Sequence, residues 1–541
     1  MTYFLVENFN SGLDLRRSIE VAPPGSLRVL RNASVNAGGE IEKRKSFTLD
    51  QTLTAYCQTN NYKGRITGPH AIPGYPNSAF FRHRHDSLPG WTAGSGSVAE
   101  YTEVGSGFQT MRFWAMKTTT ALTSFGAMLH TASGSQFAAK SYVVEKYVKS
   151  TDNTYAEQHF QVTHTNGEPT AEAAVSANAN RAFQMTLDQK GYVVEGDILY
   201  ASAVGDPTDM AGTGSGSLNI SSQGATPIGA GFALAEYFGE LAVCGRRGVQ
   251  FYSVDPDFDQ NQYQRTVTTQ IFAPRSLTGY ADGDVIYLGK NGIRSLQARD
   301  SSNYAMVTDV GSPIDRLIID ALRYLATDEE PIFSPASPDL PLSDFFDLAK
   351  GVVHPGTGEF WLFLREKIYV LSRHPGSRVL AWSTHDMPTV TSGNSSSRNG
   401  PIKSRWCADA CPVGETIVFR NFADEVFVVG GDDAETYDND LVEVVLPFMD
   451  MGEPGHYKHF TGLDLVCAGS WRIEIATKIQ PEASDVKWIT VADQVNGTTR
   501  NDPRIPLRAH GTQIALRLTS TSAERATLSQ IAIYFQKGSE K

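Results

Sequence analysis

The fold is decided by the stretch Gly239-Glu-Leu-Ala-Val-Cys-Gly-Arg-Arg-Gly-Val-Gln-Phe-Tyr252. It runs from a turn glycine and an acid through an apolar strand and a polar turn into a second strand. A shorter segment, Gly196-Asp-Ile-Leu-Tyr-Ala-Ser202, matches its opening half. Three segments align with the whole stretch without gaps: Gly283-Asp-Val-Ile-Tyr-Leu-Gly-Lys-Asn-Gly-Ile-Arg-Ser-Leu296, Gly358-Glu-Phe-Trp-Leu-Phe-Leu-Arg-Glu-Lys-Ile-Tyr-Val-Leu371 and Asp424-Glu-Val-Phe-Val-Val-Gly-Gly-Asp-Asp-Ala-Glu-Thr-Tyr437. The pattern predicts repeated hairpins, because turns such as Asn291-Gly292 adopt left-handed conformations readily.

The spacing of these segments suggests propeller blades. Gly196, Gly239 and Gly283 are separated by 43 and 44 residues (239 − 196 and 283 − 239), the length of one four-stranded blade. The next intervals are 75 and 66 residues (358 − 283 and 424 − 358), so they contain an extra blade or an insertion. We therefore expect a β-propeller-like repeat domain with insertions. A different sandwich or barrel stays open as the alternative, since any β-rich chain contains similar hairpins.

Composition agrees with a mostly β fold. The 541 residues include 48 Gly, 26 Pro, 27 Phe and 21 Tyr, which suit short strands and tight turns. We predict an N-terminal segment over residues 1–55 that carries a hairpin around Gly38-Gly39. The propeller-like domain is expected over 56–440, with an inserted lobe roughly within 85–190. A C-terminal antiparallel β-sandwich is expected over 441–541, where short strands recur at steady spacing.

A short helix is expected over residues 312–326, inside one of the long intervals. Ser312 suits the N-cap, Pro313 the first helical position, and Asp315 the positive end of the helix dipole. Apolar side chains recur on one face at helical spacing: Ile314, Leu317, Ile318, Ala321, Leu322 and Leu325. We expect this face to pack on a sheet, with docking on a partner subunit as the less favoured alternative.

Charge, cysteine content and hydropathy exclude several classes of protein. The net charge of −12 argues against a protein that grips nucleic acid by neutralising phosphates. Five scattered cysteines do not make a disulfide framework and suit a reducing cytosol. No apolar run is long enough to span a membrane, and residues 1–10 lack the pattern of a signal peptide.

Motifs for catalysis or metal binding are mostly missing. There is no Gly-x-Ser-x-Gly elbow, no Walker-type loop and no His-Glu-x-x-His helix. We therefore expect no enzyme activity, no catalytic residues, no cofactor and no metal site. The weaker candidates for metal or redox chemistry are more simply read as solvated or partly buried residues: His83, His85 and Asp86; Cys407 and Cys411; Asp255, Asp257 and Asp259, with Thr266 where a calcium loop needs Glu; and Asp432, Asp433, Glu435, Asp438 and Asp440.

Acidic residues follow the glycines of the repeat: Asp197, Glu240, Asp284 and Glu359. Glycan-cleaving propellers need converging carboxylates near the axis, so these acids have to be considered for that role. They recur in successive repeats, however, which is what a structural position does. The tryptophans, among them Trp91 and Trp114, do not distinguish a structural protein from one that binds or cleaves glycans. Trp361 and Trp382 lie in apolar strands and are expected in the core.

The order of several short motifs resembles tail nozzle (tail tubular B-type) and related virion proteins of short-tailed bacteriophages. The likeness spans most of the chain except about residues 60–190. The motifs are Phe9-Asn-Ser-Gly-Leu-Asp14, Pro24-Gly25, Asn32-Ala-Ser-Val-Asn36, Gly39-Glu-Ile-Glu-Lys-Arg44, Gly205-Asp-Pro-Thr-Asp209, Lys290-Asn-Gly-Ile-Arg-Ser-Leu296, Asp309-Val-Gly-Ser-Pro-Ile-Asp315 and Gly452-Glu-Pro-Gly-His-Tyr-Lys458.

The resemblance implies a six-fold ring at the distal end of a phage tail, assembled in the host cytoplasm. Such a ring surrounds an axial DNA channel, attaches to an adaptor ring above, and carries fibres or a needle below. DNA would pass through without specific binding, in keeping with the acidic charge. Two other functions remain open: a propeller-type host-receptor protein that binds glycans, and a glycan-degrading tail enzyme. The first predicts exposed Trp and Tyr over a polar pocket, and the second predicts buried carboxylates in an axial cleft.

Overall fold

A computed structural model gives the fold of the chain. Within the described ranges the strands form eight sheets and the helices are few and short, so the expected mostly β fold class is confirmed. The structure describes residues 2–52, 64–72, 75–85, 100–104, 110–117, 127–131, 140–148, 155–165, 168–174, 182–185, 190–206, 209–224, 226–245, 247–280, 283–301, 309–327, 349–389, 405–421, 423, 425–431, 434–478, 486–500 and 504–538.

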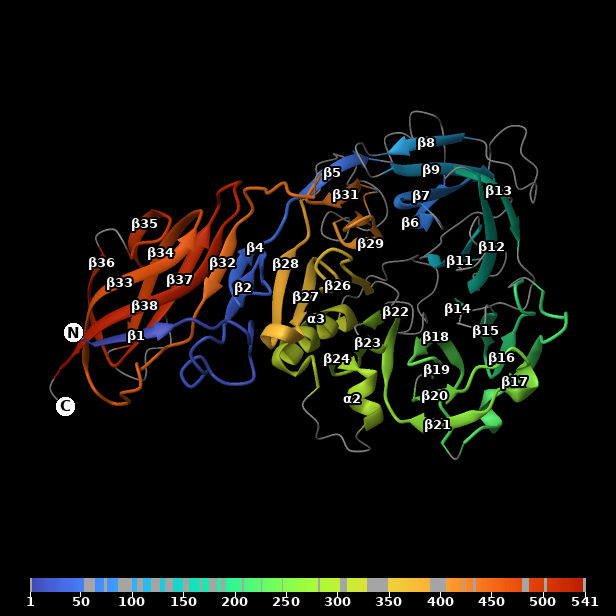
Figure 1. The fold of residues 1–541 in the computed structure, drawn as a ribbon, viewed down its shortest axis with the longest axis horizontal. Coiled ribbons are helices and arrows are strands. Elements are labelled where there is room, and N and C mark those ends of the chain that lie inside the picture. The colour runs from blue at the N-terminus through green and yellow to red at the C-terminus, as the bar shows by residue number, and fades with distance from the viewer. Residues whose placement is uncertain are drawn as a thin grey trace.

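Seven successive groups of paired strands, called blades 1 to 7, follow one another around a common centre (Figure 1). Blade 1 contains β6 (Gly64–Ile72), β7 (Tyr75–His85), β9 (Thr110–Lys117) and β8 (Glu100–Val104); blade 2 contains β10 (Ala127–Thr131), β11 (Lys140–Val148), β12 (Tyr155–Thr165) and β13 (Glu168–Ala174); and blade 3 contains β14 (Ala182–Met185), β15 (Gly191–Glu195), β16 (Ile198–Ala201) and β17 (Gly216–Asn219). Blade 4 contains β18 (Gly231–Tyr237), β19 (Glu240–Gly245), β20 (Val249–Tyr252) and β21 (Tyr263–Val267), and blade 5 contains β22 (Ile271–Tyr280), β23 (Asp284–Gly289) and β24 (Gly292–Ser295). Blade 6 contains β25 (Lys350–Val353), β26 (Phe360–Leu364), β27 (Lys367–His374) and β28 (Val379–Asp386), and blade 7 contains β29 (Cys407–Val413), β30 (Thr416–Asn421), β31 (Glu425–Val429) and β5 (Phe47–Thr52).

The seven blades close into a ring. The first strand of each blade contacts the first strand of the next, from β6 through β10, β14, β18, β22 and β25 to β29, and β29 contacts β6 again. Sheets arranged radially in this way, each packed on its two neighbours, make a β-propeller. The sequence predicted the propeller but not its blade number, which is seven within the described part of the chain.

Strand β5 closes the ring. It pairs with β31 as the outermost strand of blade 7, with Phe47 opposite Val429 and Glu425 opposite Thr52. The start of the chain is thereby hydrogen-bonded to the last blade. Residues 1–55 were expected to form a segment of their own. The structure instead divides them between the propeller and the sandwich, because short strands are stable only when a sheet gives them partners.

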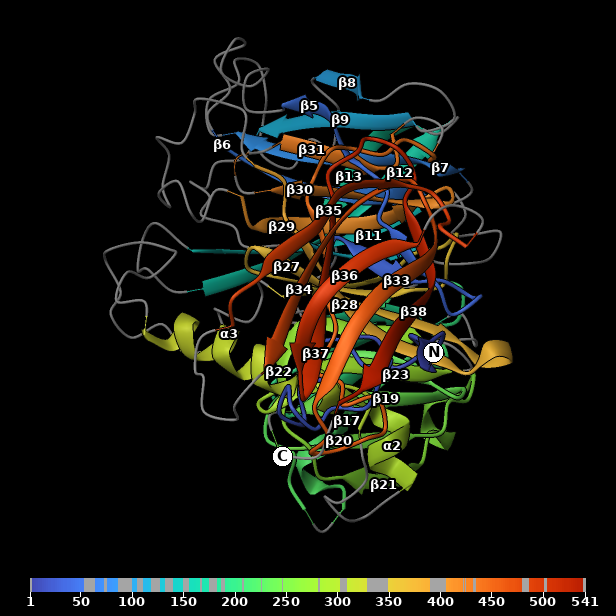
Figure 2. The same ribbon diagram turned by 90° about the vertical axis from the view of Figure 1, so that its left-hand side faces the viewer.

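The sandwich consists of two packed sheets (Figure 2). The first contains β3 (Ala33–Val35), β4 (Ile41–Lys43), β38 (Thr527–Lys537), β33 (Lys458–Ala468) and β36 (Ile505–Gly511), with β1 (Thr2–Val6) also paired to β38. The second contains β2 (Val29–Arg31), β32 (Val442–Val445), β37 (Gln513–Ser520), β34 (Ser470–Lys478) and β35 (Ile489–Asn496). The predicted C-terminal sandwich is therefore present, and the predicted hairpin at Gly38-Gly39 is the connection between β3 and β4.

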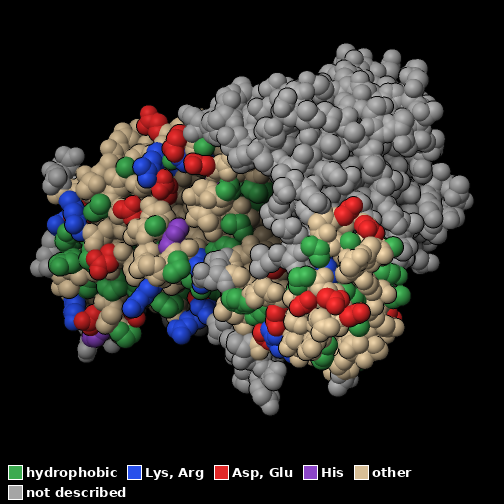
Figure 3. Space-filling model, turned by 45° about the vertical axis from the view of Figure 1, so that its right-hand side comes forward, with side chains coloured by type: hydrophobic (Ala, Val, Ile, Leu, Met, Phe, Trp, Pro, Cys, Tyr) green, Lys and Arg blue, Asp and Glu red, His purple; other side chains and the backbone are tan. Residues whose placement is uncertain are grey.

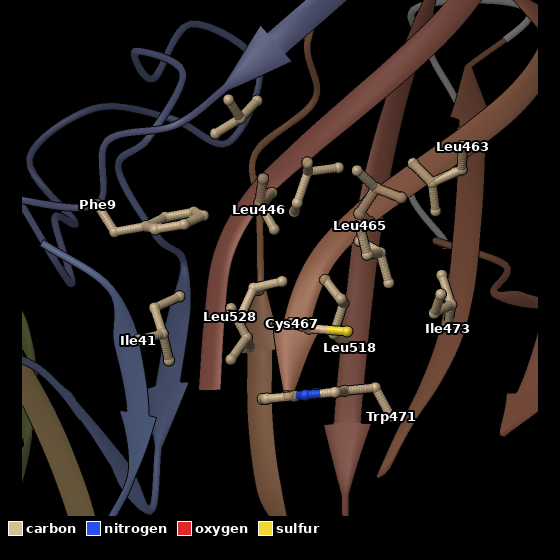
Figure 4. Packing of buried hydrophobic residues seen from close by; sticks show 14 of the residues in the cluster. Phe9, Ile41, Leu446, Leu463, Leu465, Cys467, Trp471, Ile473, Leu518 and Leu528 are labelled. Carbon is tan, nitrogen blue, oxygen red and sulfur yellow. The ribbon is translucent and has the colours of Figure 1, made fainter. Parts of the chain in front are cut away.

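Residues from both ends of the chain fill the core of the sandwich. Figure 4 shows Phe9 and Ile41 from the N-terminal segment beside Leu528 and Leu446. All four side chains are fully buried in one cluster that also contains Trp471. Burying a large apolar side chain stabilises a fold by about 1.5–3 kcal/mol, so the N-terminal residues are an integral part of this core.

One sheet continues from the propeller into the sandwich. Its order is β25-β26-β27-β28-β2-β32-β37-β34-β35, so blade 6 and the second sandwich sheet form nine hydrogen-bonded strands. Strand β2 makes the connection. It lies parallel to β28, with Arg31 opposite Thr384, and antiparallel to β32, with Leu30 opposite Val444. Main-chain hydrogen bonds therefore couple the two domains.

Two buried basic residues secure the same junction. The Nζ of Lys43 donates to the main-chain carbonyls of Asp438, at 2.5 Å, and Ser522, at 2.6 Å. The guanidinium of Arg44 pairs with the carboxylates of Asp438 and Asp440 and lies 3.9 Å from the ring centre of Phe47. Both basic side chains are almost fully buried, so the linker between the domains is tied to the N-terminal segment.

Two α-helices are described, α2 (Leu296–Ser301) and α3 (Asp315–Thr327). Helix α3 follows a 3₁₀ turn over Ser312–Ile314. Ile314 of the turn and Ile318 and Leu322 of the helix pack into the core of blades 5 and 6, and Leu317 and Ala321 lie partly buried beside them, as predicted. The Ser312 hydroxyl makes no hydrogen bond to the described residues, whereas Asp315 lies in the first turn of α3 as predicted and also pairs with Arg294. The other 3₁₀ turns are Ile220–Ser222, Phe258–Gln260 and Pro375–Ser377. No helix in the described ranges is long and apolar enough to cross a membrane.

The repeat read from the sequence mixes two kinds of hairpin. Gly239, Gly283 and Gly358 all have positive φ and connect the first and second strands of blades 4, 5 and 6. Gly196 connects the second and third strands of blade 3, and residues 425–429 form a third strand in blade 7. The equivalent glycine of blade 7 is Gly414, with φ 58°. Successive hairpins of one blade look alike locally, so the 43-residue interval from Gly196 does not measure a blade.

An inserted lobe was expected roughly within residues 85–190, and much of that range lies outside the described residues. The strands that the structure describes there, β8 to β14, belong to blades 1, 2 and 3. Blade 1 is irregular, since β7 and β9 run parallel while β8 and β9 run antiparallel.

Candidate functional site at the centre of the propeller

Charged residues, two of them buried, gather on the innermost strands of three neighbouring blades. We call Arg275 on β22, Lys350 on β25 and Asp409 on β29 the axial cluster. His70 on β6 and Arg420 on β30 act on the same carboxylate from blades 1 and 7. Arg275 and Asp409 are almost completely buried.

A bulge in β22 directs Arg275 toward blade 7. The pairing of β22 with β23 shifts register between Ala273 and Thr278, so the residues between them leave the ladder. The Ser276 hydroxyl replaces part of the lost pairing, because it donates to the Ala273 carbonyl at 2.6 Å and accepts the Leu288 amide at 2.8 Å. Such bulges redirect a side chain away from its regular position.

Arg275 then connects blade 5 with blade 7. Its Nη2 donates to Asp409 Oδ1 at 2.5 Å, and its Nη1 donates to the Ala408 carbonyl at 3.2 Å. The Nζ of Lys350 lies 3.4 Å from the same carboxylate oxygen. The carboxylate of Asp409 is therefore shared by blades 5, 6 and 7.

The electrostatics keep Asp409 ionised. Burial acts to raise the pKa of its carboxyl, but Arg275 and Lys350, assisted by His70 and Arg420, hold the pKa below its ordinary value. A catalytic acid needs the opposite shift, toward neutral pH. The axial cluster is thus chemically suited to holding the ring together rather than to transferring protons.

The acids of the repeat serve their own blades. Asp284 accepts from the Ser295 hydroxyl at 2.6 Å and from the Gln297 amide at 2.9 Å, which fixes the first hairpin of blade 5 to the strand beyond it. In blade 6, Glu359 accepts in the same way from the Ser372 hydroxyl at 2.8 Å. These contacts give both carboxylates a structural partner within their own blade.

The other two repeat acids differ in their contacts. Glu240 pairs with Arg265 at 2.8 Å. Asp197 contributes its main-chain carbonyl to the Ile220 amide. The described side-chain contacts of Asp284, Glu359 and Glu240 therefore lie within their own blades, and none of these contacts joins two carboxylates.

The cysteines and acidic loops do not form a metal site among the described residues, where no group of three or more ligands is found. Cys407 and Cys411 are buried free thiols, and burial raises the pKa of Cys407 to about 12, so neither is a reactive thiolate at neutral pH. In the loop at Asp255 and Asp257, each carboxylate accepts the amide two residues on, at 2.9 and 3.2 Å. This loop is a series of local turns.

The remaining candidates fall partly outside the described residues. His83 and His85 lie on β7, but their side chains, and the whole of Asp86, are not described. Asp432 and Asp433 are likewise outside, as is Trp91, and of Trp114 only its place on β9 is described. Asp438 and Asp440 bind Arg44, and Glu435 pairs with Lys45. Trp361 and Trp382 are buried in the core, as predicted.

An open pocket of about 510 Å³ lies between the innermost strands of blades 4 and 5. It is lined by Leu234, Ala235, Glu236, Phe238, Gly239, Leu277, Gly279, Tyr280, Gly283 and Asp284. Leu277 belongs to the same bulge of β22 as Arg275, so one irregularity of the sheet borders the pocket and supplies the axial arginine. Neither feature was predicted from the sequence. The available signals were a lone Arg275 in a strand and a Phe-Gly pair in a turn.

Comparisons with known proteins add little. No model of a protein family matches the chain, and no curated protein matches it. A functionally unknown protein from Desulfotomaculum acetoxidans is similar in structure over 63% of this chain and 96% of its own, with 11% identity and a TM-score of 0.33. An exo-β-1,3-galactanase from Phanerochaete chrysosporium covers 75% of this chain and 95% of its own, with 9% identity and a TM-score of 0.21. Neither likeness is close enough to carry an argument about function.

Proposed function

We propose that the chain is a non-enzymatic structural component of a bacteriophage tail. In this proposal it forms the nozzle or tail-tube ring at the distal end, most simply as a homohexamer in the virion. The ring attaches to an adaptor protein, carries fibre or needle proteins, and takes part in DNA retention and ejection. The order of motifs shared with tail nozzle proteins supports this assignment.

The observation that carries the proposal is the coupling of the two domains into one body. Blade 6 and the sandwich share one nine-stranded sheet, and the N-terminal segment supplies strands to both domains. An enzyme that works by hinge motion needs domains that move against each other. A component of a ring through which DNA is ejected instead benefits from main-chain hydrogen bonds that hold its two domains together. The buried contacts of Lys43 and Arg44 at the junction support the same interpretation.

The charge of the surface supports a channel that does not retain DNA. The chain carries a net charge of −12. In Figure 3, Asp and Glu side chains gather on the described propeller surface, while Lys and Arg are fewer there. Since phosphates bind through clustered basic side chains, this face would hold DNA only weakly if it lined the proposed channel.

The structural assignment predicts no turnover of host polysaccharide. The test measures the release of new reducing ends from purified host capsule or lipopolysaccharide by the full chain and by Glu236→Gln and Glu240→Gln. We expect no sustained release from any of the three proteins. Sustained release by the unaltered chain that disappears in a carboxylate variant would show an enzyme and contradict the assignment.

A further inference from the structure

The turn between β18 and β19 contains a residue that local structure does not favour. Phe238 and Gly239 both have positive φ, 48° and 79°, and Tyr237 pairs with Glu240 across them. This is a two-residue hairpin turn of the type that prefers Asn-Gly. A bulky side chain in the left-handed region is strained, and the Phe238 ring is also 51% exposed to solvent.

The exposed ring forms one wall of the pocket between blades 4 and 5. It packs edge-on against Tyr237, with ring centres 4.7 Å apart, and lies over Gly283 of the next blade. The pocket floor beside it is open, since nothing lies within 4 Å of where a Cβ would stand at Gly239 or Gly279. A flat aromatic face is therefore held beside an open volume of about 510 Å³.

The charge of the pocket is negative. The described residues that line it include two carboxylates, Glu236 and Asp284, and no Lys, Arg or His. The Asp284 carboxylate is occupied by Ser295 and by main-chain amides. In contrast, no hydrogen bond or ion pair within the described part of the chain engages the Glu236 carboxylate. The pocket thus combines one available carboxylate with one exposed aromatic face.

We propose that this pocket binds an arginine or lysine side chain of a partner protein. A cation gains from the aromatic face and from a carboxylate at the same time, and the planar guanidinium of arginine can stack as well as pair. A neutral sugar ring fits less well, because a sugar is held by several hydrogen-bonding groups and Glu236 is the one carboxylate among the described lining residues that is not already engaged. The proposal concerns binding alone and does not depend on the chain forming a ring.

The test is a titration of the full chain with the peptide acetyl-Gly-Arg-Gly-amide, followed by ligand-observed NMR. The matched ligand replaces arginine by citrulline, which has nearly the same shape but no charge. We expect the citrulline peptide to bind at least about tenfold more weakly, a difference of about 1.4 kcal/mol. Glu236→Gln should weaken the arginine peptide by a similar factor, and raising the salt concentration should weaken it further.

Phe238→Asn separates binding from folding. It installs the Asn-Gly pair that this turn prefers, so the thermal midpoint should stay equal or rise while peptide binding is lost. Tyr3→Asn is the control, because Tyr3 is an exposed aromatic residue on the sandwich, and it should bind the peptide normally. The proposal is overturned if the two peptides bind equally or not at all. It is also overturned if Phe238→Asn lowers the midpoint without affecting the peptide, or if a neutral hexose binds in a Phe238-dependent manner instead.

Discussion

Replacing Asp409 with Asn will lower the free energy of unfolding by about 3–5 kcal/mol, because the change removes one partner of a buried ion pair. Arg275 and Lys350 would then keep their charges in the propeller interior without the carboxylate that they share. Few single substitutions cost this much, since most destabilise a protein by about 0.5–3 kcal/mol. Denaturant unfolding followed by circular dichroism measures the effect.

The matched control is Glu366→Gln, which removes a carboxylate from the partly exposed pair with Arg405. Exposed pairs contribute about 0–1 kcal/mol, so this variant should unfold almost like the unaltered chain. Equal, small effects of the two substitutions would mean that the axial cluster does not hold the blades together. A large effect of Asp409→Asn alone supports its role in closing the ring.

The second large effect is a loss of stability in mild acid that depends on His385. This side chain is buried in blade 6 between the rings of Trp361 and Phe47, at 5.2 and 6.4 Å between ring centres. Burial, together with the nearby Arg44 guanidinium, lowers the pKa of His385 from 6.5 to about 3. The neighbouring Asp386 acts in the opposite direction but does not offset these effects.

The direction of the pH effect follows from these two pKa values. Below pH 6.5 the His385 side chain is protonated in the unfolded chain, whereas in the folded protein it stays neutral down to about pH 3. Stability from this residue is therefore complete above pH 6.5 and falls by up to about 1.4 kcal/mol per pH unit below it. His354 also has a lowered pKa through burial and contributes in the same direction.

His385→Phe is the variant that isolates this contribution, since it keeps an aromatic ring between Trp361 and Phe47. Unfolding midpoints measured from pH 7.5 down to pH 4.5 should fall less steeply for the variant than for the unaltered chain. The quantity compared is the change of the unfolding midpoint with pH, and not the stability of the variant at neutral pH. Identical slopes for the two proteins would show that His385 is not the residue responsible.

Local patterns in the sequence were sufficient for the features that depend on neighbours along the chain. The hairpin at Gly38-Gly39, the apolar face of the helix after Ser312 and the burial of Trp361 all follow from short-range alternation and turn chemistry. The fold class follows from the same signals summed over the chain. Such signals depend on strand and helix periodicity, which is visible without knowing which strands pair.

Features that depend on distant pairing were not predictable from the sequence. Nothing near Phe47 indicates that β5 completes the last blade, because its partner β31 lies far along the chain. The equivalence of Gly196 with Gly239 was wrong for a related reason, since one hairpin of a blade resembles the next. Asp409 was overlooked between two cysteines, because a lone acid in a strand looks like a solvated residue until its buried arginine partner is known.

The most direct test of the proposed tail role is negative-stain electron microscopy of the purified full chain over a series of concentrations. The account predicts closed rings of six copies with an axial hole, each copy showing a propeller and an attached sandwich. The fraction of rings should rise with concentration, because assembly is governed by mass action. Particles of a single chain or of three chains at every concentration would contradict the ring assignment.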